Sequence, residues 1–137
     1  MGIVRTDITL KNAFDTLACK RGIIEEQDIH QTTVEAMVDT GAMTLVINET
    51  LRQTLGLGIK RELQATLAND TKETVKLTEP VEVHWKDRNM ICEPLVISGE
   101  GEILLGAIPL EGMDLMVDPV RGELTGAHGD EIVGILK

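Results

Sequence analysis

The stretch that decides how this chain is interpreted is Ala36-Met37-Val38-Asp39-Thr40-Gly41-Ala42, seven residues near the end of the first third. An apolar run leads directly into an acidic residue and then into a turn, because Asp, Thr and Gly are typical of tight turns. The glycine gives the turn a backbone freedom that other residues lack. The pattern therefore predicts that the carboxylate of Asp39 is held rigidly at the edge of a hydrophobic core. An ordinary strand-ending turn without a chemical role is the alternative interpretation.

The segments on both sides of this turn have the residue pattern of β-strands. Residues 4–10 alternate between apolar and polar side chains, and residues 31–38 are rich in β-branched side chains. Two hairpins are expected, the first around Asn69-Asp70 and the second across the polar turn 86–89. The further predicted strands are 63–68, 71–77, 81–85, 90–97, 102–105 and 131–137.

One helix is clearly predicted, and it follows the strand region that contains the Asp39 turn. Asn48 is a suitable N-cap, Leu51 and Leu55 lie one helical turn apart, and Gly56 stands where a helix commonly ends. A single helical turn is also possible at Pro109, because proline is tolerated at the first helical position. Many short strands joined by turns predict a mainly β fold, closed or sandwiched, in a single domain over residues 1–137.

The composition excludes several classes of function. The 137 residues include 13 Lys and Arg against 23 Asp and Glu, a net charge of −10, which argues against nucleic acid as a partner. Phe14 and Trp85 are the only aromatic residues, so a base-stacking platform is not expected either. The longest apolar run, residues 103–110, is shorter than the ~20 residues of a membrane helix, and the N-terminus lacks an apolar signal core. A cytoplasmic protein without a membrane partner is expected.

The sequence offers no metal site. Cys19 and Cys92 lack the spacing of metal ligands and are expected to be free or buried thiols. His30, His84 and His128 are widely separated and share no ligand-like spacing.

A second motif, Ile103-Leu104-Leu105-Gly106, is an apolar strand that ends in glycine. Together with the Asp39-Thr40-Gly41-Ala42 turn, it resembles the retropepsin-like aspartic proteases, the family of retroviral proteases and their cellular and bacterial relatives. In that family the turn supplies the catalytic Asp, and a later apolar-apolar-Gly segment packs beside it. The resemblance is strongest over residues 31–120 and points to a bacterial-type, single-domain member.

The resemblance implies a small closed β-barrel of the retropepsin type, with one or two short helices, that forms a two-fold homodimer. It implies a catalytic Asp39 supported by its turn, a second motif packed beside that turn, and a hairpin tip that acts as the substrate-binding flap. The residues implied to support the turn are Thr40, Gly41 and Ala42. The second motif is Leu104, Leu105 and Gly106. The implied flap is Leu67, Ala68, Asn69, Asp70 and Thr71.

The chain contains a single Asp-Thr-Gly, because Asp114, Asp118 and Asp130 are not followed by such a turn. The second catalytic carboxylate must then come from a second copy of the chain. The implied function is an aspartic endopeptidase that needs no metal or cofactor and acts on a peptide or an unfolded protein. Because the expected flap tip lacks glycine, a catalytically weak or inactive peptide- or protein-binding module is the alternative, and a purely structural dimer is the third hypothesis.

Overall fold

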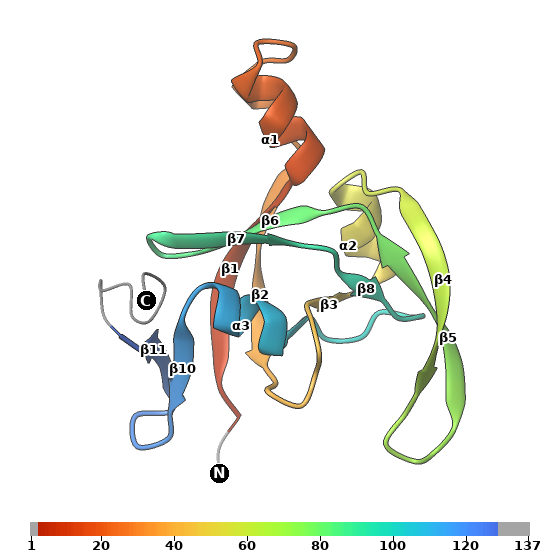
Figure 1. Ribbon diagram of the computed structural model, residues 1–137, viewed down its shortest axis with the longest axis vertical. Helices are drawn as coiled ribbons and strands as arrows, with labels where there is room; N and C mark the ends of the chain where they lie inside the picture. The colour runs from red at the N-terminus through yellow and green to blue at the C-terminus, as the bar shows by residue number, and fades with distance from the viewer. Residues whose placement is uncertain (1–2, 129–137) are drawn as a thin grey trace, which may run out of the picture.

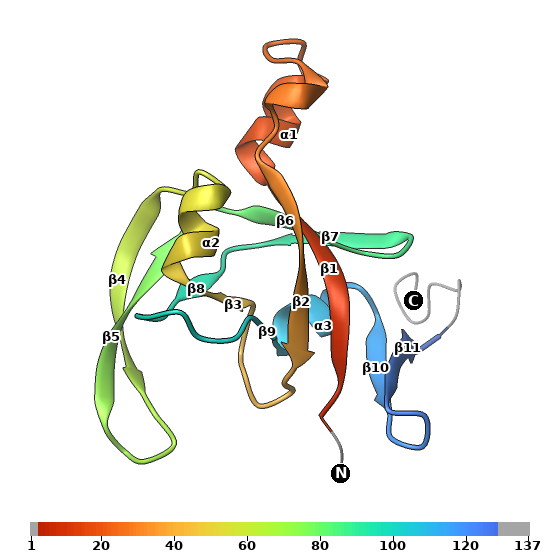
Figure 2. The same ribbon diagram turned by 180° about the vertical axis from the view of Figure 1, so that it is seen from behind.

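The computed structural model describes residues 3–128, and this part of the chain is mainly β with few helices (Figures 1 and 2). None of its helices is long and apolar enough to cross a membrane. The strand predicted at 131–137 lies outside the described residues. The strands are β1 (Arg5–Asn12), β2 (Gln31–Val38), β3 (Val46–Ile47), β4 (Ile59–Thr66), β5 (Lys72–Thr78), β6 (Val81–Trp85), β7 (Arg88–Cys92), β8 (Leu95–Val96), β9 (Leu104–Leu105), β10 (Leu115–Asp118) and β11 (Glu123–Gly126). The helices are α1 (Ala13–Lys20), the 3-10 helix η1 (Glu26–Asp28), α2 (Glu49–Thr54) and α3 (Ala107–Gly112).

Nine strands form one curled sheet in the order β4-β5-β8-β3-β9-β2-β1-β6-β7, and β10 pairs with β11 in a separate hairpin. The two predicted hairpins are present as β4–β5 and β6–β7. The sheet is a half-barrel, whereas the sequence predicted a closed barrel. One reason is visible in the chain, because β7 ends at Cys92, two residues before Pro94, which has no N–H for a continued ladder. The chain then bends into β8, which pairs with β3 and β5 instead.

The core lies on the inner face of this curled sheet. The alternation in β1 buries Ile8 and Leu10, and the alternation in β6 buries Val81 and Val83, as expected for strands with one face on the core. The predicted helix α2 is confirmed, since the Asn48 side chain accepts a hydrogen bond from the N–H of Leu51.

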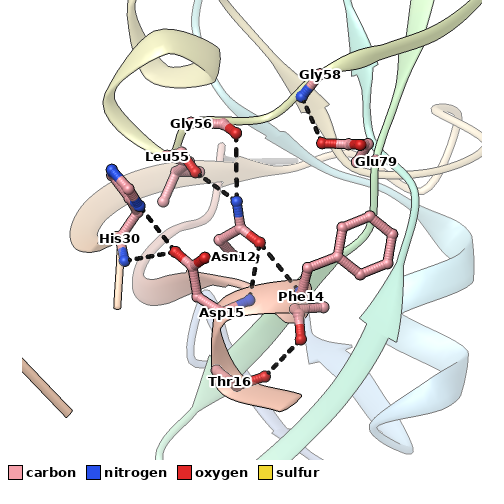
Figure 3. Close-up of polar contacts among 10 residues, drawn as sticks. Asn12, Phe14, Asp15, Thr16, His30, Leu55, Gly56, Gly58 and Glu79 are labelled. Atoms are coloured by element: carbon pink, nitrogen blue, oxygen red, sulfur yellow. Dashed lines mark hydrogen bonds and ion pairs between the residues drawn. The ribbon is translucent and has the colours of Figure 1, made fainter. Parts of the chain in front are cut away.

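Helix α1 was not predicted. Residues 3–128 contain three α-helices, so the prediction of one or two is wrong. The helix begins where β1 ends, because the Asn12 Oδ1 accepts hydrogen bonds from the N–H groups of Phe14 at 3.0 Å and Asp15 at 3.2 Å (Figure 3). The Asn12 Nδ2 donates to the carbonyl of Leu55 at 2.9 Å, which fixes α1 to the end of α2. The buried Asn12 therefore ends β1 and caps the start of α1, and α1 projects from the sheet (Figure 1).

The β10–β11 hairpin is a second feature that the sequence did not predict. Its start is fixed by Arg88, whose Nη1 donates to the carbonyls of Met113 at 2.9 Å and Asp114 at 2.8 Å. Asp114 has a left-handed backbone (φ 56°), and its Oδ1 pairs with the Nδ1 of His128 at 2.7 Å. The two thiols, Cys19 and Cys92, are free.

Candidate active site

Asp39 directly follows β2, and the end of this strand is fixed from both sides. On one side the N–H of Val38 donates to the carbonyl of Val4 at 2.8 Å. On the other side β2 runs parallel to β9, with Met37 opposite Leu104 and Val38 opposite Leu105. The N–H of Asp39 continues this ladder to the carbonyl of Leu105 at 3.0 Å. The backbone that carries the carboxylate is therefore held by the N-terminal segment on one side and by β9 on the other.

The turn after Asp39 orients its carboxylate. The N–H of Gly41 donates to the Asp39 Oδ1 at 2.9 Å, and the N–H of Ala42 donates to the Asp39 carbonyl at 3.1 Å. Asp39 itself is half-buried, whereas Thr40 and Gly41 are exposed. A Cβ atom on Gly41 would lie 3.2 Å from the Asp39 Oδ1, closer than ordinary van der Waals contact. The residues of the turn thus leave a rigidly held acid at an accessible surface.

The second predicted motif lies against this turn. Immediately after β9, a Cβ atom on Gly106 would lie 2.2 Å from the carbonyl oxygen of Thr44 and 2.6 Å from that of Ala42. Only glycine fits where two backbone segments approach this closely. The N–H of Ala107 donates to the Ala42 carbonyl at 2.8 Å, and α3 starts from this contact. The structure therefore brings together two motifs that the sequence keeps far apart, and their catalytic and supporting roles stay predictions.

The residues predicted as a flap, 67–71, form the tip of the β4–β5 hairpin. The N–H of Leu67 donates to the carbonyl of Thr71 at 2.8 Å, and Asp70 adopts a left-handed backbone (φ 63°). Asp therefore occupies the turn position that glycine commonly fills. The tip lies at the same end of the molecule as the turn after β2 in both views (Figures 1 and 2). Its action as a substrate-binding flap stays a prediction.

Two hollows border the loop that carries Asp39. The first has a volume of about 640 Å³ and is lined by Asp39 and Thr40 together with apolar side chains of the N-terminal segment, β2 and the β10 region. The second, of about 550 Å³, lies between the residues that follow the turn, the β4–β5 hairpin and β7. The expected helical turn at Pro109 is present as α3, and its residue Ile108 lines the second hollow. Sequence analysis missed the contribution of β10 to the first hollow, because no motif marks this strand.

Cys92, at the edge of the second hollow, is not a candidate nucleophile. Burial raises the pKa of its thiol to about 11, so the thiol stays protonated at neutral pH. The catalytic role of Asp39 stays a prediction, and Cys92 offers no alternative to it.

A family model described as gag-polyprotein putative aspartyl protease matches residues 26–117. The chain belongs to this family of retropepsin-like aspartic proteases, which confirms the resemblance. The retroviral protease-like domain of Ddi1 from Leishmania major has the same fold, with a TM-score of 0.50 and 17% identity over 74% of this chain and 82% of that domain. A retropepsin-like aspartic protease from Rickettsia conorii matches with a TM-score of 0.45 and 16% identity over 86% of this chain and 89% of that one. No curated protein matches the chain.

Proposed function

We propose that this protein is an aspartic endopeptidase that hydrolyses peptide bonds with a water molecule activated by Asp39 and by Asp39 of a second copy. The observation that carries the proposal is the anchoring of the Asp39 turn by the Leu104-Leu105-Gly106 segment in a chain of the aspartyl protease family. Such anchoring holds a carboxylate in a fixed position before substrate arrives, which is what proton transfer in a transition state requires.

In this mechanism the two carboxylates share one proton. The ionised carboxylate takes a proton from a water molecule while the oxygen of that water attacks the carbonyl carbon of the substrate. The protonated carboxyl gives its proton to the carbonyl oxygen, which forms a gem-diol intermediate. The carboxyl that took the proton from water then donates it to the leaving nitrogen, a hydroxyl of the diol returns its proton to the other carboxylate, and the C–N bond breaks to release an amine and a carboxylic acid. The substrate is a peptide or an unfolded protein in extended form, because an extended chain can add backbone hydrogen bonds to a sheet protein and place its side chains in pockets.

The dimer is part of the proposal, because one chain supplies a single Asp-Thr-Gly. Apolar side chains beside Asp39 support a second copy at this surface, where they line the hollow of about 640 Å³. Ile3 is 65% exposed within it, and Val117 and Pro119 complete the wall. A two-fold axis near Asp39 would bury this surface and bring the two carboxylates together.

A second candidate function is a peptide-binding module that does not cleave. The β4–β5 tip supports it, because it contains no glycine and is held by internal hydrogen bonds, including one from the N–H of Asp70 to the Leu67 carbonyl at 2.9 Å. A stiff flap would slow closure over a substrate and the release of products.

Cleavage of a pool of unfolded peptides from acid to neutral pH tests the proposal, with wild type and the Asp39→Asn variant compared at equal concentration. The variant keeps the shape of the side chain and removes the ionisable group. We expect wild type to cut and the variant to lose at least ~100-fold in rate, the scale of general acid–base catalysis. Equal cutting by both proteins would refute the assignment of Asp39, and binding of peptides without cutting by wild type would favour the second candidate.

A further inference from the structure

The second hollow beside the Asp39 loop is lined by several apolar side chains that are exposed to solvent. Three of its lining side chains, Met43, Ile91 and Ile108, are 65%, 57% and 44% exposed. Leu63 of β4 and Leu77 of β5 form the facing wall. Clustered exposed apolar groups around a concave surface mark a binding site more often than scattered ones do.

This hollow lies within reach of a substrate bound at Asp39. Met43 is four residues beyond Asp39, so the Cα atoms of the two residues are at most ~14 Å apart even in a fully extended chain. The N–H of Ile108 donates to the Met43 carbonyl at 2.9 Å, which fixes α3 to the loop. Because an extended substrate advances by ~3.3 Å per residue, a side chain within about four residues of the scissile bond can enter the hollow.

The charged residues at the rim favour an acidic substrate residue. Arg61 of β4 lines the hollow, and its guanidinium neither donates a hydrogen bond to a described residue nor forms an ion pair with one. The acid at the same rim, Glu93, is already paired with the Nζ of Lys60 at 2.5 Å. Because Lys60 neutralises Glu93, Arg61 leaves a net positive charge at this rim, in a chain whose net charge is −10. A guanidinium without a protein partner is well suited to pair with a carboxylate of a ligand.

We infer that this hollow is a specificity subsite, which takes a large aliphatic side chain of the substrate while Arg61 pairs with an acidic residue within two positions of it. The inference rests on the proposed function, because it assumes that an extended substrate binds at Asp39. It adds which substrate sequences the site prefers. Peptides with an aliphatic residue next to Asp or Glu are the preferred substrates. Peptides with Lys or Arg beside the aliphatic residue are disfavoured, because the added cation would meet Arg61.

Cleavage profiling with a pool of synthetic 14-residue peptides of known sequence tests this inference. Wild type is compared with Ile108→Ser and Arg61→Glu, because both side chains are exposed and their replacement leaves the core intact. We expect Ile108→Ser to lower the preference for Leu, Ile or Met at one substrate position by about tenfold, the scale of burying one such side chain. We expect Arg61→Glu to reverse the preference for an acidic residue near that position. The cleavage rate should change two- to fivefold for each charged substrate residue there, as for exposed ion pairs.

Two control variants match these changes outside the hollow. Ile59→Ser removes a side chain that is 40% exposed on the same strand as Arg61 but does not line the hollow. Arg21→Glu makes the same change in net charge at the end of α1. Both controls are expected to keep the wild-type profile. If Ile108→Ser and Arg61→Glu also keep it while wild type cleaves, the subsite is refuted and the protease stands.

Binding of the same peptides to the Asp39→Asn variant separates the subsite from catalysis. We expect this variant to retain acidic-aliphatic peptides more tightly than their Lys-containing counterparts, and to lose the difference when Arg61→Glu is added. This result without any cleavage by wild type would sustain the subsite and refute the proposed catalysis. Binding that is the same for acidic and basic peptides would overturn the subsite.

Discussion

Gly106→Ala tests whether the two motifs must touch for the active-site turn to form. The added Cβ atom would lie 2.2 Å from the Thr44 oxygen and 2.6 Å from the Ala42 oxygen, against ordinary contact distances above 3.4 Å. Both oxygens belong to backbone, and the Ala42 oxygen also accepts the hydrogen bond of Ala107, so the loop must shift by about 1 Å. Overpacking of this kind costs about 1–3 kcal/mol, and we expect the upper end because no flexible side chain can move aside.

The assay is thermal unfolding followed by circular dichroism, together with the rate of peptide cleavage. For 137 residues an unfolding entropy of ~2.1 cal/mol/K per residue converts 3 kcal/mol into a fall in Tm of about 10 °C. Gly101→Ala is the matched control, because its Cβ atom would meet only the Cδ1 of Ile97, at 3.7 Å. We expect the control to keep Tm within about 2 °C. Equal Tm values and equal cleavage rates for the two variants would refute the argument that the turn depends on this contact.

Three further predictions concern stability and reactivity. Asn12→Ala should lower the free energy of unfolding by about 2–3 kcal/mol in urea titrations, because it removes both a helix cap and a buried donor. Hydrogen bonds from Arg52 lower the pKa of Glu49 from 4.5 to about 2, so the stability that this pair contributes is present above pH 4.5 and lost as the pH falls towards 2. Glu49→Gln should therefore flatten the pH dependence of the free energy of unfolding between pH 4.5 and 2. An unchanged slope in this range would contradict the pairing. Iodoacetamide at pH 8 should modify Cys19 and spare Cys92 until the protein is unfolded, as intact mass will show; rapid modification of both would contradict the raised pKa of Cys92.

The local features of the fold could be predicted because each depends on neighbouring residues. Alternation in residues 4–10 and 81–85 gave β1 and β6, and the Asn48 cap gave α2. Helix α1 could not be recognised in the same way, since its start depends on Asn12, whose amide is buried by contact with the end of α2. The local signals for this short helix were Asn12 as the N-cap, Asp15 in the first turn and Lys20 in the last turn.

The candidate site shows the same division. The Asp39 turn was predicted from its own residues, and the second motif was predicted through the resemblance to a family. That β2 and β9 pair in parallel cannot be worked out from local pattern, because the partners are far apart in sequence. The β10 side of the first hollow was missed for a related reason, since Val117 becomes part of its wall only when β10 folds back against the loop. The closed barrel failed because Pro94 and the short β8 redirect the chain after β7.

In the proposed mechanism two copies of Asp39 form one catalytic site, and mixing wild type with the Asp39→Asn variant tests this most directly. Wild type at constant concentration is equilibrated with increasing amounts of Asp39→Asn, and the rate of peptide cleavage is measured. If the site needs an Asp39 from each copy, mixed dimers are inactive, so activity should fall to about one half at equal amounts and to about one tenth at ninefold excess. Activity that stays constant through the whole series would contradict a shared site.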